Sequence, residues 1–182
     1  MKGPETIETA RLRLRKPRLD DAQAIFSRYA NDPDVTAHVG WPRHRSVDDT
    51  RGFLSFAEAE WERWPAGAYL VERRADGVLI GGTGLSFETP HRAMTGYVFA
   101  RDAWGHGYAT ESLGAMVDLA RRCGVQRLYA LCHTDHAPSY HVLEKCGFAR
   151  EGIWRRHSVF PNLAPDDPAD VFCYARLFGP EA

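Results

Sequence analysis

A stretch in the middle of the chain combines a short strand, a glycine-rich turn and an amphipathic helix, and it limits the fold more than any other feature. Residues 96–100 are dense in aromatic and β-branched side chains, which is typical of a strand. Gly105 and Gly107 follow, where the backbone must turn sharply or approach something closely. From Ala109 onward, apolar residues recur at helical spacing, and Gly124 is expected to end the helix.

The start of that helix is a candidate phosphate site. The first turn of a helix leaves backbone N–H groups unpaired, and the helix dipole adds partial positive charge there, so a phosphate binds without any charged side chain. A dinucleotide fingerprint would require Gly or Ala where Thr110 stands, and the Gly-Lys-Ser/Thr of a P-loop is absent from the sequence. The turn therefore indicates another kind of phosphate ligand, or only a tight connection between strand and helix.

Length and composition bound the class of protein. The chain has 182 residues, of which 44% are hydrophobic and 26% charged, so residues 1–182 are expected to form a single compact domain. A net charge of −1 provides no overall field that would attract nucleic acid or a membrane surface. No apolar run approaches the roughly 20 residues of a membrane span. We therefore expect neither nucleic acid nor membrane as a partner.

The N-terminal residues and the cysteines indicate the cellular compartment. The segment MKGPETIETARLRLRK contains no apolar signal core, so we expect a cytoplasmic location. The four cysteines show no Cys-x-x-Cys spacing, and free thiols in a reducing cytoplasm explain them best.

Hydrophobic periodicity and turn residues predict one mixed α/β domain with seven strands and about four helices. The expected strands are 6–15, 67–74, 78–87, 94–100, 126–133, 148–160 and 169–178. The expected helices are 20–30, 46–63, 109–123 and one that begins within 135–139 and ends at 146–147. Because a helix connects them, strands 94–100 and 126–133 are expected to be parallel. Irregular loops are expected at 35–45 and 162–168.

Two local patterns in the first third of the chain carry specific predictions. Ser46 and Asp49 resemble a capping box, so the helix that follows should begin there and run through about Arg63. In residues 6–15, arginines alternate with apolar side chains, and we expect these arginines to form a solvated strand face.

The motifs resemble those of a known family. Residues 104–109 are similar to the Q/R-x-x-G-x-G/A acyl-CoA motif of the GNAT N-acetyltransferase superfamily, with Trp104 in the first place. The longer run GYVFARDAWGHGYATESL resembles the RimJ/RimL-like branch, which contains ribosomal-protein N-terminal acetyltransferases. TARLRLR, HTDHAPSYHVLEKCGF and DVFCYA resemble the same branch. The similarity spans nearly the whole chain, and its pieces occur in the family's order.

The resemblance implies a GNAT (acyl-CoA N-acyltransferase) fold, in which two strands splay apart and admit the pantetheine arm of acetyl-CoA. The diphosphate would then lie against the amides of Gly105–Thr110. Backbone groups at 97–99 would pair with pantetheine, and one N–H would stabilise the oxyanion. The implied cosubstrate-binding residues are Tyr97, Val98, Phe99, Trp104, Gly105, His106, Gly107, Tyr108, Ala109, Thr110, His136, Ser139, His141 and Lys145.

The implied reaction moves an acetyl group from the thioester to a primary amine by direct attack. An α-amine is easier to neutralise than a lysine by roughly 3.5 kcal/mol, so an enzyme with a weak base should favour N-terminal or other less basic amines. Many members of the family place a tyrosine where Leu143 stands here. RimL-like members use a serine instead, which makes Ser139 the candidate proton donor to the CoA sulfur. The family's asparagine is replaced by His136.

The general base and the metal content are less well defined by the sequence. The branch often has a glutamate where Met94-Thr95 stand, and Glu88 is the nearest acidic candidate for a catalytic base; a solvated turn carboxylate is the alternative. Cys132, His133, His136 and His141 lack the spacing of a tetrahedral site, so no metal is expected.

The acceptor remains open between two kinds of amine, and a third interpretation is not catalytic. A protein N-terminal α-amine follows from the branch, and a small-molecule amine is the alternative. The missing glutamate and His136 would also suit a non-catalytic acyl-CoA-binding module. Residues 41–45 lie where the family builds its acceptor wall, although an exposed loop with no substrate role is the favoured interpretation. We expect a monomer or a homodimer.

Overall fold

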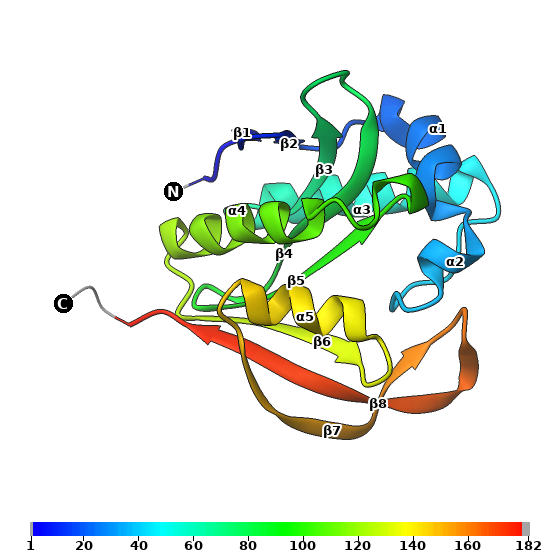
Figure 1. Ribbon diagram of the computed structural model, residues 1–182. Coiled ribbons are helices and arrows are strands. Elements are labelled where there is room, and N and C mark those ends of the chain that lie inside the picture. The colour runs from blue at the N-terminus through cyan, green and yellow to red at the C-terminus, as the bar shows by residue number, and fades with distance from the viewer. Residues whose placement is uncertain (1, 180–182) are drawn as a thin grey trace.

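Eight strands form one twisted, mixed sheet in the computed structural model, which describes residues 2–179 (Figure 1). The strands are β1 (Thr6–Glu8), β2 (Leu12–Arg15), β3 (Ala68–Arg73), β4 (Leu79–Thr89), β5 (Arg92–Phe99), β6 (Arg127–His133), β7 (Ala149–Phe160) and β8 (Ala164–Leu177). Their order across the sheet is β1-β2-β3-β4-β5-β6-β8-β7, and β5–β6 is the parallel pair. The α/β fold with a mixed sheet is therefore confirmed.

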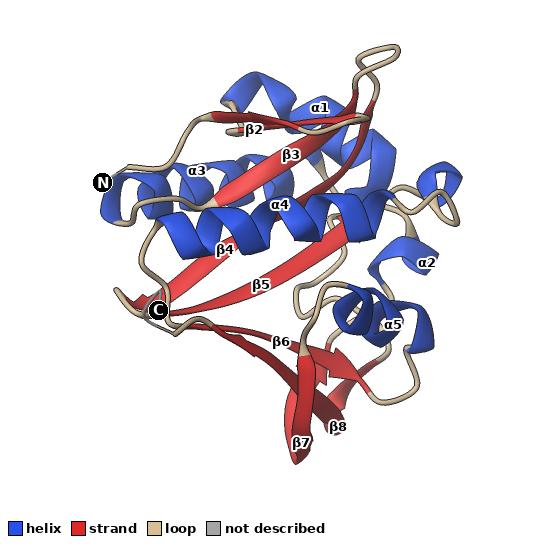
Figure 2. Ribbon diagram, turned by 60° about the vertical axis from the view of Figure 1, so that its left-hand side comes forward, coloured by secondary structure: helices blue, strands red, loops and turns tan. Residues whose placement is uncertain are grey.

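Five α-helices cover the two faces of the sheet (Figure 2). They are α1 (Ala22–Ile25), which a π-helical segment extends over Phe26–Ala30, α2 (Pro33–Thr36), α3 (Val47–Arg63), α4 (Tyr108–Arg122) and α5 (Ala137–Lys145). One buried cluster holds Leu113 of α4 and Leu143 of α5 against the sheet, and a second joins Ile25 of α1 and Leu54 of α3 to Leu70. Within residues 2–179, no helix is long and apolar enough to cross a membrane.

The predicted first strand is two strands. Thr6–Arg15 doubles back as an antiparallel hairpin, with Ile7 paired to Leu14 and the Thr9 N–H donating to the Leu12 carbonyl at 2.9 Å. The sheet therefore has eight strands and not seven. Its alternating pattern continues through the reversal, so the sequence periodicity alone does not reveal the turn.

Two further predictions are corrected. The predicted loop 35–45 begins inside a helix: α2 starts soon after the predicted helix 20–30 and runs to Thr36, because the Asp32 side chain caps it and Pro33 occupies the first helical position. β8 begins at Ala164 and not at 169, so the loop predicted at 162–168 is mostly strand. Over 164–170, β8 pairs with β7 alone and not with β6, and this one-sided pairing tolerates the prolines.

Several local predictions are confirmed. Ser46 accepts a hydrogen bond from the Asp49 amide in a capping box, and α3 ends at Arg63. Gly124 adopts a left-handed φ of +80° just after α4, as a helix-ending glycine does. These signals depend on a few neighbouring residues, so they can be read without knowledge of the fold.

The two parallel strands separate soon after they meet. β5 and β6 are paired only from Arg92–Met94 to Arg127–Tyr129. β5 continues to Phe99 and β6 to His133 without further pairing, and Figure 2 shows the two ribbons diverging. This leaves an opening in the sheet, called the β5–β6 opening below, which is closed at Met94 and widens toward Phe99 and His133.

Candidate active site

The N-terminus of α4 presents open backbone amides beside the β5–β6 opening. Gly105 and Gly107 both have a left-handed φ, +78° and +77°. A Cβ added at Gly105 would meet no atom within 4 Å, and one at Gly107 would meet only a guanidinium nitrogen of Arg11 at 3.5 Å. The Glu111 N–H donates to the Gly107 carbonyl at 3.1 Å, and no side chain of residues 2–179 caps the helix. The amides of 108–110 are thus available to an anion.

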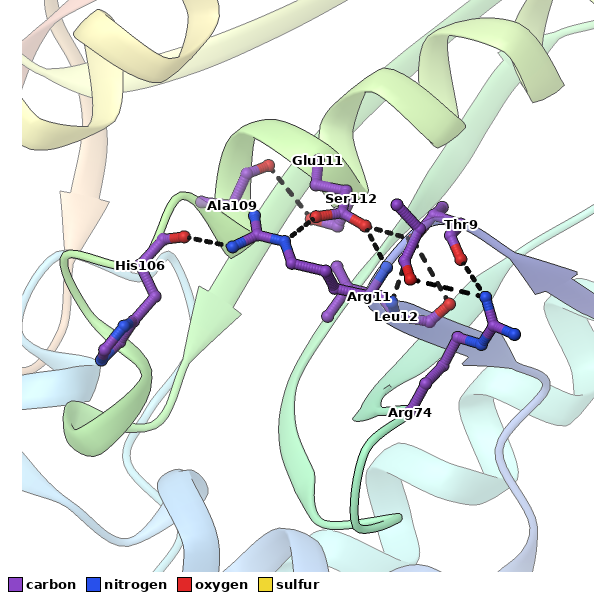
Figure 3. A network of polar contacts seen from close by, with 9 residues as sticks. Thr9, Arg11, Leu12, Arg74, His106, Ala109, Glu111 and Ser112 are labelled. Atoms are coloured by element: carbon purple, nitrogen blue, oxygen red, sulfur yellow. Dashed lines mark hydrogen bonds and ion pairs between the residues drawn. The ribbon is translucent and has the colours of Figure 1, made fainter.

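Arg11, one of the arginines expected on a solvated strand face, is half exposed but also lies against this loop (Figure 3). Its Nε lies 2.7 Å from Glu111 Oε2, and its Nη1 donates to the His106 carbonyl at 2.9 Å. The guanidinium also lies over the Tyr108 ring, 4.7 Å from the centroid. Although partial burial opposes it, hydrogen bonds from Thr9 and Arg11 lower the pKa of Glu111. Glu111 lies in the first turn of α4, the candidate phosphate site, where its negative charge would oppose an anion unless a cation paired with it. The position of Glu111 in the sequence was therefore the available signal that a cation should lie nearby.

Trp104 fixes the end of β5 to the glycine-rich turn. Its indole Nε1–H donates to the Phe99 carbonyl at 2.7 Å, while half of the residue remains exposed. The His106 and Tyr108 rings stack with their centroids 5.6 Å apart. Trp104, the first residue of the acyl-CoA motif, therefore ties the end of β5 to the start of the glycine-rich turn.

Strand alternation decides which backbone groups of β5 face the opening. The Ala100 N–H donates to the Ile80 carbonyl of β4 at 2.9 Å. Since backbone groups of alternate residues point to the same side, the N–H and C=O of Val98 also point toward β4. Tyr97 and Phe99 present their N–H groups toward the opening. Three residues, 97–99, were expected to pair with pantetheine. The backbone N–H and C=O of Val98 point away from the opening, so only Tyr97 and Phe99 are placed to do so.

Tyr97 and Ser139 meet across the opening. The Tyr97 hydroxyl donates to the Ser139 carbonyl at 2.8 Å and lies 3.1 Å from Ser139 Oγ. Burial raises the pKa of Tyr97, so the phenol stays protonated at neutral pH. His141 is exposed on α5 with its ring against Tyr140, and Lys145 lies at the far end of that helix, about 9 Å along it from Ser139.

Glu88 and Ser139, the two residues predicted to be catalytic, are not brought together. The Glu88 carboxylate accepts hydrogen bonds from the Tyr129 hydroxyl and from Arg92. These two contacts outweigh partial burial and lower the pKa of Glu88. The preceding residue, Phe87, pairs with β5 four residues before Tyr97, which corresponds to about 13 Å of strand. Glu88 therefore lies at the closed end of the opening, already ion-paired.

Three histidines gather at the open end. His38 follows α2, His133 ends β6 and His136 precedes α5. The His38 and His136 rings stack with centroids 4.3 Å apart, and the His133 ring lies edge-on to His38 at 5.4 Å. Burial, followed by the neighbouring imidazoles, lowers the pKa of His136 to about 4. His38 was not singled out from the sequence, because its partners come from distant segments.

Within residues 2–179, no group of three or more His, Cys, Asp or Glu side chains is placed to hold a metal ion. The Asp135 amide donates to His133 Nδ1 at 3.1 Å, which gives one ring nitrogen a protein partner.

The β7–β8 turn closes the other side of this region. The Asn162 side chain accepts a hydrogen bond from the Arg43 amide at 2.7 Å. It also donates to the carbonyls of Thr36 and Trp41, at 2.8 and 2.9 Å. One side chain therefore holds the loop after α2, which carries His38, to the tip of the β7–β8 hairpin. We call this loop, residues 37–45, the acceptor-side loop.

Comparisons with known proteins define the class. The family model described as "Acetyltransferase (GNAT) domain" matches residues 11–149. An N-acetyltransferase of Bacillus subtilis, YoaA, itself uncharacterised, is 30% identical over 164 residues, covering 88% of this chain and 92% of YoaA. The chain therefore belongs to the GNAT acetyltransferase family, and it is an N-acetyltransferase.

Solved structures share the fold over almost the whole chain. A GNAT-family acetyltransferase from Bacillus anthracis superposes with a TM-score of 0.82 at 26% identity, covering 94% of this chain and 98% of that one. RimL, described as a ribosomal L7/L12 alpha-N-protein acetyltransferase in complex with coenzyme A, has a TM-score of 0.84 at 24% identity, with 96% and 98% coverage.

Proposed function

We propose that this N-acetyltransferase uses acetyl-CoA as its donor and acetylates the α-amine at the N-terminus of a protein, as members of the RimJ/RimL-like branch do. The observation that carries the proposal is the set of open amides at the start of α4, beside two strands that separate. The amides suit a phosphate group, and the space between the strands suits an extended chain. Acyl-CoA has both, since its diphosphate is joined to the pantetheine arm. RimL, which shares the fold, is described in complex with coenzyme A.

The cosubstrate residues follow from this geometry. The diphosphate is held by the amides of residues 105–110, with Arg11 neutralising Glu111 so that no negative charge opposes it. The pantetheine arm lies between β5 and β6, along the backbone of Tyr97 and Phe99. Trp104 is bonded to the end of β5 and His136 follows the end of β6, so both border the wide end of this path, while His141 and Lys145 lie further along α5.

The chemistry needs an oxyanion donor and a proton for the leaving sulfur. The thioester supplies an electrophilic carbonyl when it is bound. An N–H of Tyr97 or Phe99 stabilises the oxyanion that forms as the amine attacks. Ser139 Oγ then gives a proton to the departing sulfur, and Tyr97, which stays protonated, orients that hydroxyl. Because a thiol has a pKa near 8.5, this help need only be modest.

The choice of acceptor rests on acidity and on relatives. The Glu88 carboxylate is ion-paired and has a lowered pKa, so it is a weak base. A weak base favours an α-amine over a lysine side chain. RimL is described as an alpha-N-protein acetyltransferase. A small-molecule amine remains the alternative acceptor.

One pair of measurements tests the proposal. Calorimetry with acetyl-CoA should give saturable binding, and thiol release should appear when peptides with free N-termini are added. N-terminally blocked peptides of the same sequence that keep a lysine serve as the matched control. Turnover of small amines alone would reassign the acceptor, and binding without thiol release from any amine would indicate a non-catalytic acyl-CoA module. Absence of binding would overturn the proposal.

A further inference from the structure

The three histidines at the open end of the β5–β6 opening have no role in the chemistry described so far. His38, His133 and His136 are all half-buried, and Phe160 of β7 packs edge-on against His133 at 5.1 Å. The rings of His38 and His136 have no hydrogen-bond partner among residues 2–179, yet no polar side-chain atom there is both buried and unpaired. Their ring nitrogens are therefore open to solvent or to a bound molecule.

The cluster reaches the opening from the side opposite Ser139. Successive β6 side chains point to opposite faces of the sheet. Cys132 belongs to the core beneath α4 and α5, so His133 faces the other side. His38 comes from the acceptor-side loop, whereas Ser139 lies in the first turn of α5 and meets Tyr97. A thioester bound between β5 and β6 would therefore have the Tyr97 and Ser139 hydroxyls on one face of the sheet and the histidine imidazoles on the other.

The spacing along α5 keeps the two groups close. The Ser139 N–H donates to the His136 carbonyl at 3.0 Å, so these residues are one turn apart. His136 stacks directly on His38 at 4.3 Å, with an interplanar angle of 16°. The imidazoles are thus within one helical turn of the proposed sulfur proton donor, whereas Glu88 is at the opposite end of the opening.

Hydrogen bonding distinguishes the three rings. His133 Nδ1 accepts from the Asp135 amide, so the neutral ring carries its proton on Nε2 and cannot accept another without losing that bond. His38 and His136 are not constrained in this way. His136 is the more enclosed of the two and lies at the start of α5, while His38 belongs to the loop that would face an incoming amine.

We propose that His38 accepts the proton of the attacking amine, with His136 stacked against it as a positioning residue. This inference rests on the proposed acetyl transfer. The amine nitrogen forms the new C–N bond with its lone pair, and its proton passes to an open ring nitrogen of His38. The C–S bond breaks, and the sulfur takes the electron pair and a proton from Ser139 Oγ. His38 then returns its proton to water, and Ser139 Oγ regains a proton from water, so that overall the proton lost by the amine balances the one gained by the sulfur.

The charges around His38 favour a neutral ring at physiological pH. Burial first, and then the His133 imidazole, lower the pKa of His38, while Asp135 acts in the opposite direction. His136 faces it from α5 and is itself neutral. A neutral imidazole has a free lone pair, as a proton acceptor requires. Measured with saturating peptide, the acid limb of the kcat profile should therefore lie below pH 6.5.

The test uses acetyl-CoA and a peptide with a free N-terminal serine as the probe. His38→Gln should lower kcat at least about tenfold, with the KM for acetyl-CoA within about twofold, and should remove the acid limb. Added imidazole should partly restore His38→Gly. His133→Gln should move the acid limb to higher pH, because a neighbouring imidazole is lost. His91→Gln, an exposed histidine in the β4–β5 turn, is the matched control.

A second readout does not depend on turnover. Diethyl pyrocarbonate should modify His38 in the free protein, and saturating acetyl-CoA should protect it while His91 stays reactive. Unchanged His38 reactivity in the presence of bound acetyl-CoA would overturn the inference, as would His38→Gln with parental kcat. If acetyl-CoA gives no binding heat, the proposed function fails; if it binds and turns over while the His38 variants match the parent, only this inference fails.

Discussion

Arg11 and Glu111 form an ion pair 2.7 Å long that joins the β1–β2 turn to the first turn of α4. The Glu111 carboxylate also accepts hydrogen bonds from the Thr9 hydroxyl, at 2.6 Å, and from the Arg11 amide, at 2.8 Å. The ion pair joins two structural elements, because Glu111 holds the β1–β2 turn and Arg11 donates a hydrogen bond to the His106 carbonyl. The edge of the sheet thus braces the candidate phosphate loop.

Arg11→Ala is expected to weaken acetyl-CoA binding about tenfold, with little change in kcat. The substitution exposes the ligand phosphates to an unneutralised Glu111 and releases the loop; tenfold corresponds to about 1.4 kcal/mol. Calorimetry measures the effect. Arg13→Ala is the control, because Arg13 is half exposed and, within residues 2–179, pairs only with Glu8 on the neighbouring strand. The double variant Arg11→Ala/Glu111→Gln should recover part of the loss; an Arg11→Ala protein that binds like the parent contradicts the assignment.

Glu88→Gln separates two candidate bases. A catalytic base at Glu88 predicts a fall in kcat/KM of more than tenfold. Because Glu88 is paired with Tyr129 and Arg92 at the closed end of the opening, we expect a change of less than about threefold and a lower Tm. The comparison with His38→Gln under the same conditions decides between them. A tenfold loss with an altered pH profile would restore Glu88 as the base.

The parts of the site that the sequence predicted depend on local rules. Gly105 and Gly107 occupy positions where a positive φ is required, and the apolar period after them fixes α4. The reversal at Thr9 was not predicted, because it contains no glycine and is held by Glu111 from α4. Such a turn has no local signature. Its stability comes from a carboxylate about a hundred residues away in the chain.

The histidine cluster was missed for the same reason. His133 and His136 lie close in sequence and were noticed, but the ring that stacks on His136 belongs to His38. His38 lies in the acceptor-side loop, which Asn162 holds to the β7–β8 turn. Hydrophobic periodicity describes one segment at a time, so it cannot predict a contact among side chains of separate segments. The sequence alone supports the hypothesis that β5 lines the cosubstrate path, whereas the direction of the Val98 backbone required the strand register.

Histidine protonation should also make stability depend on pH. The folded-state pKa of His136 is lowered to about 4 from 6.5, so the unfolded chain binds the proton first as the pH falls. Stability from this group is present above pH 6.5 and is lost between about pH 6.5 and 4. His136→Gln should therefore show a smaller fall in Tm across that window than the parent. His91→Gln should show the parental fall, and identical slopes for all three proteins would contradict the burial of His136.

Ser139→Ala should lower kcat by about tenfold, with a small effect on Tm. The loss is modest because thiolate is a good leaving group, and it should be greatest below the thiol pKa. Tyr97→Phe removes the hydroxyl that contacts Ser139 and should lower both kcat and Tm, since it also unties β5 from α5. Steady-state kinetics and thermal unfolding separate the two effects. Ser55→Ala, on the exposed side of α3, is the control. An unchanged kcat in Ser139→Ala would remove that hydroxyl from the mechanism.

Asn162→Ala tests whether the acceptor-side loop is held from the β7–β8 turn. The substitution deletes three hydrogen bonds to backbone groups, at Thr36, Trp41 and Arg43, and should destabilise the protein by roughly 1–3 kcal/mol. Because it loosens the loop that carries His38 without touching α4, the KM for the acceptor peptide should rise several-fold while acetyl-CoA binding stays unchanged. Asn31→Ala, at an exposed position before α2, is the matched control. A parallel loss of acetyl-CoA affinity would mean that this turn supports the whole opening and not the acceptor side alone.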